Sequence, residues 1–154
     1  MLWLSVRVIA YYNREDESRM EVAAPQDKVS FTLNYKYDKL SVMLRNVRFG
    51  QVIYLDPTMN PDNPATFVAN AFNAGTKETL DQTFAPKIVT DLTIGYQITK
   101  QINFSLGANN LFDVYQDKHS HSGNLSLGRF VYSRRVQQMG FNGRYVFGRL
   151  VFKL

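Results

Sequence analysis

The sequence predicts an all-β fold, an antiparallel up-and-down meander of about six strands. Over several stretches apolar and polar residues alternate with a period of two, which is typical of strands that have one apolar and one polar face. All five prolines lie between these stretches or at their starts, where a missing N–H does not interrupt the ladder of a sheet. Very short turns alternate with long polar connections, and no segment is predicted to be helical. Together these patterns indicate neighbouring hairpins.

The first predicted strand covers about residues 2–13, where apolar residues alternate from Leu2 to Ala10. This stretch does not resemble a secretory signal peptide, because it has no basic start and Arg7 interrupts its apolar residues. The chain is therefore expected to open within a strand.

Two further strands are predicted at about residues 27–38 and 39–55, joined by a tight turn at residues 38–39. The apolar face of the first strand consists of Val29, Phe31, Leu33, Tyr35 and Tyr37. The second strand changes phase near Arg45, which predicts a β-bulge at that point.

The last three strands are predicted at about residues 86–99, 101–112 and 137–154. A short turn near residue 100 joins the first two of these strands, and the final strand alternates less strictly. Long polar connections are predicted at about residues 14–26, 56–85 and 113–136.

Periodicity alone does not decide which solvent the apolar face meets. In a soluble barrel that binds an apolar ligand this face points inward, whereas in an outer-membrane barrel it faces lipid and the lumen is polar. Strands of roughly 10–14 residues are long enough to cross a bilayer when tilted, and the alternation of short turns with long loops matches outer-membrane barrels. Aromatic residues near the strand ends are typical of interfacial girdles; they are Tyr11, Tyr12, Tyr35, Tyr37 and Phe152. These features favour lipid.

Six strands are too few for a complete membrane barrel, because bacterial barrels have an even number of about eight or more. A six-stranded sheet in lipid has two open edges, whose unpaired backbone groups cost several kcal/mol each. The chain is therefore expected to be either part of a larger barrel or a soluble open sheet.

Composition excludes several classes of function. The 154 residues include no cysteine, so disulfides and cysteine metal sites are excluded. The formal charge of +5 is concentrated in residues 118–154, which hold seven basic residues and no acidic one. These cations match no nucleic-acid-binding motif, and no nucleic acid partner is expected. No nucleophile–base pattern or phosphate-binding glycine loop is visible, so neither enzymatic activity nor a cofactor is predicted.

Two clusters resemble metal sites but have simpler explanations. His119 and His121 offer two imidazoles, yet no third ligand lies near them in sequence, and a solvated loop is the preferred interpretation. Asp56 opens an oxygen-rich run, but Pro61 and Phe67 stand where a calcium loop needs glycine and glutamate. Turn formation explains this run better, so no metal site is predicted.

One run of residues carries a family resemblance. The run is Gly107-Ala108-Asn109-Asn110-Leu111-Phe112-Asp113-Val114-Tyr115. It resembles the G-x-N-N-L-F-D-x-Y segment near the C-terminus of TonB-dependent outer-membrane receptors. Val89–Tyr96 is similar to the penultimate hairpin of that family, Arg45–Gly50 to an earlier strand, and Gly140–Tyr145 to the closing strand of Bacteroidetes-type members. The resemblance extends from about Arg19 to Leu154.

The resemblance implies that the chain is the last six strands of a barrel of about 22 strands, closed by an N-terminal plug. Such receptors take up a scarce nutrient, a siderophore, cobalamin, oligosaccharide or peptide, across the outer membrane of Gram-negative cells. The implied partners are outer-membrane lipid and lipopolysaccharide, the plug and remaining strands, the TonB complex, and the barrel assembly machinery. The plug and TonB box are not in this chain, so the isolated fragment is not expected to transport.

The motif residues are interpreted as structural. They are Gly107, Asn109, Asn110, Leu111, Phe112, Asp113 and Tyr115. Asn109 is expected to face the lumen, Leu111 and Phe112 to lie near the membrane rim, and Asp113 to cap the following turn.

Ligand capture is expected from the long loops, where Phe67, Phe72 and Phe84 are the candidate contacts. Phe152 and Leu154 are the candidate assembly signal at the C-terminus. Proteins of the outer membrane commonly end in an aromatic residue, so the terminal leucine departs from that pattern.

Overall fold

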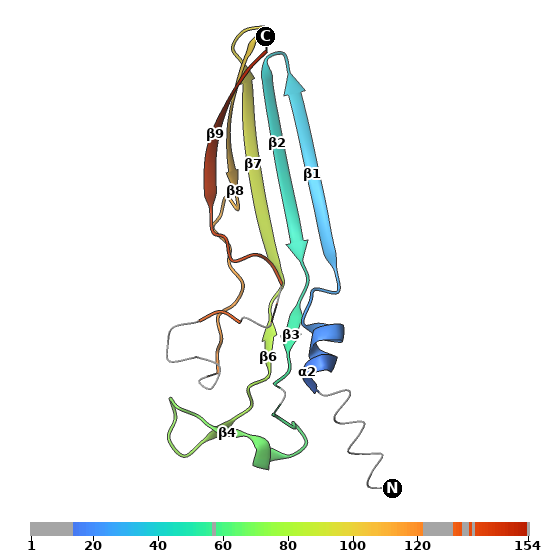
Figure 1. Ribbon diagram of the computed structural model, residues 1–154, viewed down its shortest axis with the longest axis vertical. Coiled ribbons are helices and arrows are strands. Elements are labelled where there is room, and N and C mark those ends of the chain that lie inside the picture. Colours follow the sequence, from blue (N-terminus) through green and yellow to red (C-terminus); the bar gives the residue numbers. More distant parts are fainter. Residues whose placement is uncertain (1–13, 57, 122–130, 134–135, 137, 154) are drawn as a thin grey trace. The chain divides into compact units, whose positions relative to one another are not determined.

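The computed structural model describes residues 14–56, 58–121, 131–133, 136 and 138–153 (Figure 1). The chain divides into two units. The sheet unit consists of Asp27–Phe49, Pro86–Tyr115 and Met139–Leu154. The loop unit consists of Met1–Gln26, Gly50–Ala85 and Gln116–Gln138.

Five long strands make up the sheet unit, and they pair with their neighbours in chain order. They are β1 (Lys28–Tyr37), β2 (Leu40–Phe49), β7 (Lys87–Gln97), β8 (Ile102–Asn109) and β9 (Tyr145–Phe152). Every pairing is antiparallel, and the sheet order is β1-β2-β7-β8-β9 (Figure 1). Within the described residues the sheet is open, with β1 and β9 at its edges. The predicted all-β meander is therefore confirmed.

Short turns lie at one end of this sheet, which we call the turn end. β1 and β2 are joined at Asp38 and Lys39, and Asp38 has a φ of 48°, a left-handed conformation that Asp adopts more readily than most residues. β7 and β8 are joined through residues 98–101, where the Ile98 N–H donates to the Ile102 carbonyl at 2.9 Å. The long connections leave the sheet at its opposite end, which we call the loop end.

The β-bulge predicted near Arg45 is wrong. β2 pairs without interruption with β1 from Leu40 to Phe49, and with β7 over the same residues. The phase changes because Asn46 and Arg48 follow Leu44 on the apolar face, whereas Val47 and Phe49 lie on the polar face. The Asn46 side chain accepts a hydrogen bond from Thr90 Oγ1 at 2.6 Å. The chain leaves the sheet at Gly50 instead, so the predicted strand 39–55 is two strands in different sheets.

Other strand boundaries also differ from those predicted. The strand expected at 101–112 ends at Asn109, and the strand expected at 137–154 begins only at Tyr145. The strand expected at 2–13 lies outside the described residues.

The loop unit contains short elements. Its two small sheets pair β3 (Val52–Tyr54) with β6 (Gln82–Phe84) and β4 (Val68–Ala69) with β5 (Lys77–Glu78). Its helical turns are α2 (Arg14–Glu17), the π-helical η1 (Ser18–Val22) and the 3₁₀ turn η2 (Pro64–Thr66). The helix at α2 and η1 was not predicted, because so short a segment does not show a 3.6-residue period. None of the helices among the described residues has the length and apolar character needed to cross a membrane.

A small apolar core holds the loop unit together. It is formed by Val52, Tyr54, Phe84 and Val136, all of which are buried. The buried Gln138 side chain donates from Nε2 to the carbonyls of Gly50, at 2.9 Å, and Ala85, at 2.7 Å. Gln138 thereby ties together the two backbone segments that flank the β3–β6 hairpin.

Candidate functional site

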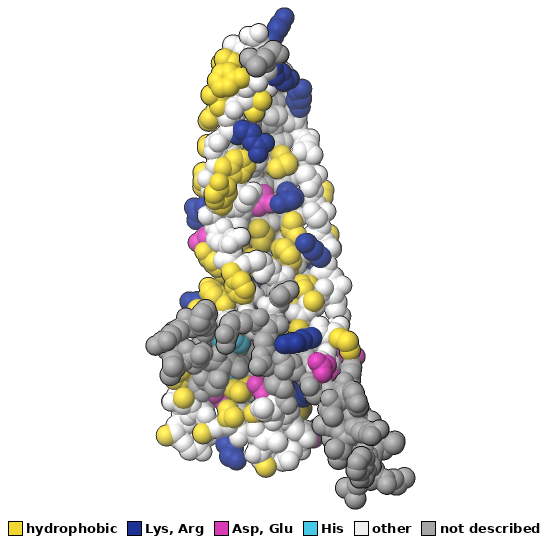
Figure 2. All heavy atoms as spheres, viewed as in Figure 1, with side chains coloured by type: hydrophobic (Ala, Val, Ile, Leu, Met, Phe, Trp, Pro, Cys, Tyr) yellow, Lys and Arg dark blue, Asp and Glu magenta, His cyan; other side chains and the backbone are white. Residues whose placement is uncertain are grey.

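The sheet has one strongly apolar face, and this face is exposed. Residues that pair directly across antiparallel strands share a face, so the register of Leu33 with Leu44, Leu44 with Leu92 and Leu92 with Ala108 defines it. Its exposed members are Val29, Phe31, Leu33, Tyr35, Tyr37, Leu40, Ile88, Ile94, Tyr96, Phe104, Leu106, Val146, Leu150 and Phe152. Figure 2 shows many yellow side chains over the sheet. So extensive an apolar surface indicates a nonaqueous environment or a partner.

The opposite face is predominantly polar and contains a hollow of about 770 Å³. Each of the five strands contributes to its lining, for example through Lys28, Arg45, Asp91, Asn109 and Tyr145. The register places all of these strand residues on the polar face. The polar face is therefore the concave face of the sheet.

Exposure along β7 supports this assignment. On the apolar face Ile88, Ile94 and Tyr96 are exposed, whereas none of the alternate residues from Lys87 to Gln97 is exposed. A sheet that is apolar outside and polar inside matches the wall of an outer-membrane barrel. It disfavours the soluble module, which needs its apolar face inside.

An ion pair lies in the polar hollow. Arg45 and Asp91 are directly opposite each other on β2 and β7. Arg45 donates to Asp91 Oδ2 from Nε at 2.8 Å and from Nη2 at 2.5 Å. The Asp91 side chain is only 6% exposed, and its Oδ1 accepts the backbone N–H of Asn110 at 2.8 Å. The strand pair is thus linked to the motif that follows β8.

Asn110 closes the turn of the Gly107–Tyr115 motif. Its φ is 50°, and its side-chain oxygen accepts the Val114 N–H at 2.8 Å. Its amide nitrogen donates to the carbonyls of Val114, at 2.8 Å, and Asn142, at 3.3 Å. The Leu111 N–H also donates to the Thr90 carbonyl at 2.7 Å. The motif thereby joins β7, β8 and the segment that leads into β9.

Asp113 has a different role from the one predicted. Instead of capping the turn that follows it, Asp113 accepts the backbone N–H of Arg144 at its Oδ1 at 2.7 Å, immediately before β9. A side chain at Gly143 would overlap the Tyr115 hydroxyl group, so glycine permits this close approach. The cap for the turn comes from Asn110, and Asp113 and Tyr115 position the start of the last strand.

The remaining motif residues occupy the following places. Gly107 lies on the polar face, where a side chain would overlap the Phe147 ring. Asn109 is exposed and lines the hollow. Leu111 is half-buried and Phe112 is exposed.

Aromatic residues collect on the apolar face near the turn end. Tyr37 and Tyr96 both flank Leu40 in the register, and Tyr96 is opposite Phe104. Tyr35 lies one position further from the turn on the same face, and Phe152 is opposite Ile102. Tyr35, Tyr37 and Phe152, three of the residues of the predicted aromatic belt, lie together at this end, whereas Tyr11 and Tyr12 lie outside the described residues. Of the candidate assembly signal, Phe152 is exposed and Leu154 is outside that range.

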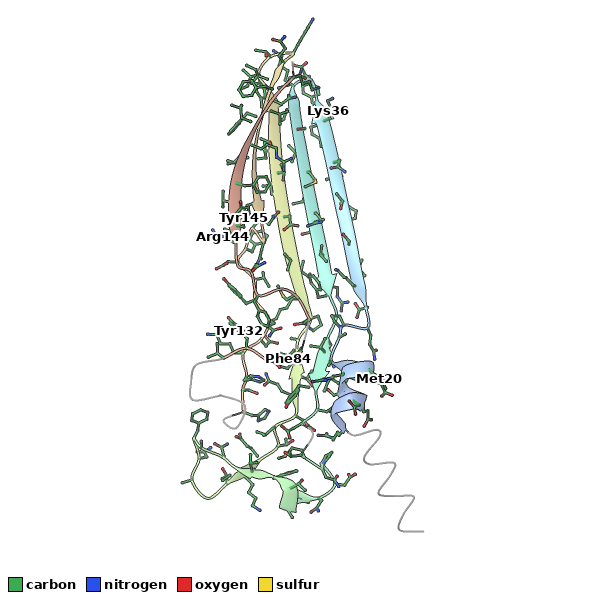
Figure 3. The ribbon with its side chains drawn as sticks, in the orientation of Figure 1. Met20, Lys36, Phe84, Tyr132, Arg144 and Tyr145 are labelled. Atoms are coloured by element: carbon green, nitrogen blue, oxygen red, sulfur yellow. The ribbon has the colours of Figure 1, made fainter. Side chains whose placement is uncertain are left out.

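The three candidate ligand-contact residues occupy very different environments. Phe84 is fully buried in β6, at 0% exposure, and Figure 3 labels it; it belongs to the core of the loop unit instead of an exposed loop. Phe67 is half-buried. Phe72 is 70% exposed, in a turn where Asn70 Oδ1 accepts its N–H at 2.8 Å. Of the three, only Phe72 is well placed to meet a ligand.

A charged network joins the N-terminal helix of the loop unit to the segments around it. Arg14 donates to Asp81 from both terminal nitrogens and to the Asp56 carbonyl at 2.7 Å. Burial alone would raise the pKa of Asp81, but the hydrogen bonds from Arg14 and from the Asp56 backbone hold the pKa below its ordinary value. The carboxylate of Asp81 is thus kept ionised at neutral pH.

The oxygen-rich run beginning at Asp56 forms turns, as predicted. Asp56 Oδ1 accepts the Thr58 N–H at 2.8 Å. Asn60 and Asn63 accept backbone N–H groups two residues onward, at 3.0 and 3.1 Å. These side chains are used within the loop itself.

His119 and His121 have separate protein partners. The ring of His119 lies edge-on to Tyr54 and Phe84, and burial, with a contribution from His121, lowers the pKa of His119. His121 Nδ1 is 3.6 Å from Glu78 Oε2. No cluster of three or more potential metal ligands occurs within the part of the chain that the structure describes.

Comparison with solved structures finds similar folds in two receptors of Pseudomonas aeruginosa. One is a point mutant of the ferric enterobactin receptor, with 16% sequence identity and a TM-score of 0.52 over 84% of this chain. The other is the ferripyoverdine receptor of the outer membrane, bound to ferripyoverdine, with 20% identity and a TM-score of 0.49 over 82% of this chain. This chain corresponds to only 16% and 14% of their lengths.

The chain shares the fold of a stretch of the ferric enterobactin receptor. At these sequence identities the similarity shows the fold alone. The ferric enterobactin receptor, with a TM-score of 0.52, supports that similarity of fold. No protein-family model matches the sequence, and no curated protein matches it.

Two parts of this site were not found from the sequence. Arg45 and Asp91 form a pair because the strand register places them directly opposite each other. Knowledge of the register would have revealed the pair. The role of Gln138 depends on contacts with Gly50 and Ala85, which are far away in sequence. No local pattern marks either interaction.

Proposed function

We propose that this chain is part of the transmembrane β-barrel of a TonB-dependent outer-membrane receptor. The observation that carries the proposal is the orientation of the sheet, whose apolar face is exposed and whose polar face is concave and hollowed. Apolar positions on β1 run from Val29 to Tyr37, about 27 Å of strand at about 3.4 Å per residue. At a tilt of about 40° this length spans about 21 Å, close to the apolar band of an outer-membrane barrel, which is about 25 Å tall.

The larger protein would be a barrel of about 22 strands with a plug in its lumen. Its function would be uptake of a scarce nutrient, a siderophore, cobalamin, oligosaccharide or peptide, with energy coupled through the TonB complex. The polar hollow would face the plug, and the loop unit would form part of the mouth that captures ligand. Lipopolysaccharide around the loops and the barrel assembly machinery are further partners under this proposal. The Bacteroidetes-type character suggested by Gly140–Tyr145 rests on those residues alone.

A pair of substitutions on neighbouring residues of β1 tests this orientation. Leu33, near the middle of the strand, is on the apolar face, and Asn34 is on the polar face; both are exposed. Arginine near the middle of a bilayer destabilises a barrel by about 2–4 kcal/mol. Leu33→Arg should therefore weaken partitioning of the refolded chain into phosphatidylcholine vesicles by about that amount, measured by flotation. Asn34→Arg, which adds the same charge facing the lumen, should change partitioning little.

The outcome separates the two hypotheses for the chain. Equal effects of the two substitutions, or a chain that remains a soluble monomer and ignores vesicles, would reject the membrane barrel. A stronger effect of Asn34→Arg would indicate that the polar face, and not the apolar face, is covered.

A further inference from the structure

The turn end of the sheet is positively charged. Residues 36–41, 97–103 and 151–153 include four lysines, Lys36, Lys39, Lys100 and Lys153, and one acidic residue, Asp38. All four lysines are exposed. Lys36 is labelled near this end in Figure 3, and Figure 2 shows dark blue side chains there. The turn end thus carries an excess of three positive charges in the described residues.

These lysines differ from the two arginines of β2. Towards the loop end, Arg45 is paired with Asp91 and Arg48 with Asp27. Among the described residues, no ion pair involves any of the four turn-end lysines. The arginine charges are therefore neutralised within the sheet, whereas the lysine charges are available to an external anion.

Three of the lysines lie in the turns or after the last strand, beside the aromatic belt of the apolar face. Lys39 directly precedes Leu40 of that face, and the N–H of Lys153, which follows Phe152, donates to the Gln101 carbonyl at 2.8 Å. Lys36 pairs with Ser41 and therefore lies on the opposite, polar face. Tyrosines are enriched where hydrocarbon meets headgroups, and lysine side chains extend from such positions to reach the headgroups. The two features place this end of the sheet at a lipid–water boundary.

We infer that Lys39, Lys100 and Lys153 bind the headgroups of anionic phospholipids, specifically phosphatidylglycerol. The inference rests on the proposed function, because it requires lipid on the apolar face. A lysine is a flexible point charge that suits a phosphate without a fixed geometry, and exposed basic residues next to a membrane are attracted to anionic lipid. Because the lysines lie on separate turns and strand ends, each meets a different part of the lipid boundary. The result is a selective contact with one class of lipid at one membrane surface.

Two sets of three lysines provide a matched experiment, because Lys39, Lys100 and Lys153 lie in the turns or after β9, whereas Lys28, Lys36 and Lys87 lie on the polar face. The turn-end variant changes Lys39, Lys100 and Lys153 to glutamine. The control variant changes Lys28, Lys36 and Lys87 to glutamine and has the same net charge. For the refolded full chain and both variants, partition constants are measured by flotation with vesicles of phosphatidylcholine alone and with vesicles that also contain phosphatidylglycerol.

The ratio of the two partition constants measures the preference for anionic lipid. At low salt the turn-end variant should lose up to about fivefold of this ratio for each lysine removed, while the control variant should retain most of it. An unchanged ratio in the turn-end variant, equal losses in both variants, or no preference in the unmodified chain would overturn the inference. An unmodified chain that remains a soluble monomer and does not partition into phosphatidylcholine alone would instead reject the proposed function, and the inference with it.

Discussion

The loop unit and the sheet unit place their apolar side chains in opposite ways. In the loop unit Val52, Tyr54, Phe84 and Val136 form a buried core, as in a protein that folds in water. In the sheet unit most large apolar side chains are exposed. Among the described residues of the loop unit, Met20 and Phe72 are the only large apolar side chains that are exposed. One chain therefore contains two parts that are suited to different solvents.

The difference shows which contribution to the folding free energy stabilises each unit. In the loop unit, burial of apolar surface removes it from water and contributes directly to folding. In the sheet unit the strand ladders satisfy the backbone, and under the proposed function the apolar face would gain its stabilisation from an external apolar phase. The same substitution, phenylalanine to alanine, should therefore have different consequences in the two units.

The largest expected effect is that of Phe84→Ala. Removing this fully buried ring should destabilise the loop unit by about 3–5 kcal/mol. Phe31→Ala, on the apolar face of β1, should cost much less in detergent, because its ring is 59% exposed and contacts mobile detergent. Trypsin cleavage of the refolded protein at Lys77 and Lys118 reports opening of the loop unit, and chemical unfolding reports the sheet.

A large cost for Phe31→Ala in detergent would break the comparison. It would mean that the apolar face is packed against protein and not against an apolar solvent. Slow cleavage in Phe84→Ala would show that the loop unit does not depend on its core.

A smaller effect is expected inside the sheet unit, where two ion pairs differ in burial. Asp91→Asn removes the charge that faces Arg45 and weakens the acceptor for the Asn110 N–H, at an expected cost of about 1–3 kcal/mol. Asp27→Asn, which breaks the exposed pair with Arg48, should cost less than about 1 kcal/mol. Guanidinium unfolding in detergent measures both. Equal costs would show that the hollow is fully hydrated and that Asp91 does not organise the motif.

The strands and turns of this fold were accessible from the sequence because their causes are local. The alternation from Val29 to Tyr37 and the turn at Asp38 depend on neighbouring residues only, and both are found in the structure. The sequence did not show which face of the sheet is concave, because an inverted barrel has the same alternation of apolar and polar residues. The hollow lined by Arg45 and Asp91 decided it.

Errors arose where a distant residue determines the environment of a side chain. Asn46 interrupts the apolar pattern of β2, yet its bond to Thr90 leaves the register intact, so the pattern wrongly indicated a bulge. Phe84 follows a long polar connection but packs into a core with Val136, far along the chain. The Asp113 side chain accepts a hydrogen bond from the Arg144 N–H instead of capping the turn that follows it. In each case the deciding partner belongs to another segment.

The smallest expected effect concerns the pH dependence of the loop unit, through His119. Burial and the neighbouring His121 lower the pKa of His119 below its ordinary value of 6.5, so the folded unit disfavours the charged ring. As pH falls through about 6.5, the unfolded chain binds a proton that the folded unit does not. The loop unit should therefore lose stability as pH falls from about 7.5 towards the lowered pKa of His119, and below that pKa the loss should level off.

Hydrogen-exchange protection of β3 and β6, corrected for the intrinsic effect of pH, measures this loss. His119→Gln should remove the pH dependence in this range, whereas His121→Gln should leave most of it, because burial is the larger cause. The sheet unit provides an internal reference, since neither histidine belongs to it. If β7 and β8 lost protection in parallel with β3 and β6, the two units would be unfolding together. The two units would then differ in how they are stabilised but would not open independently of each other.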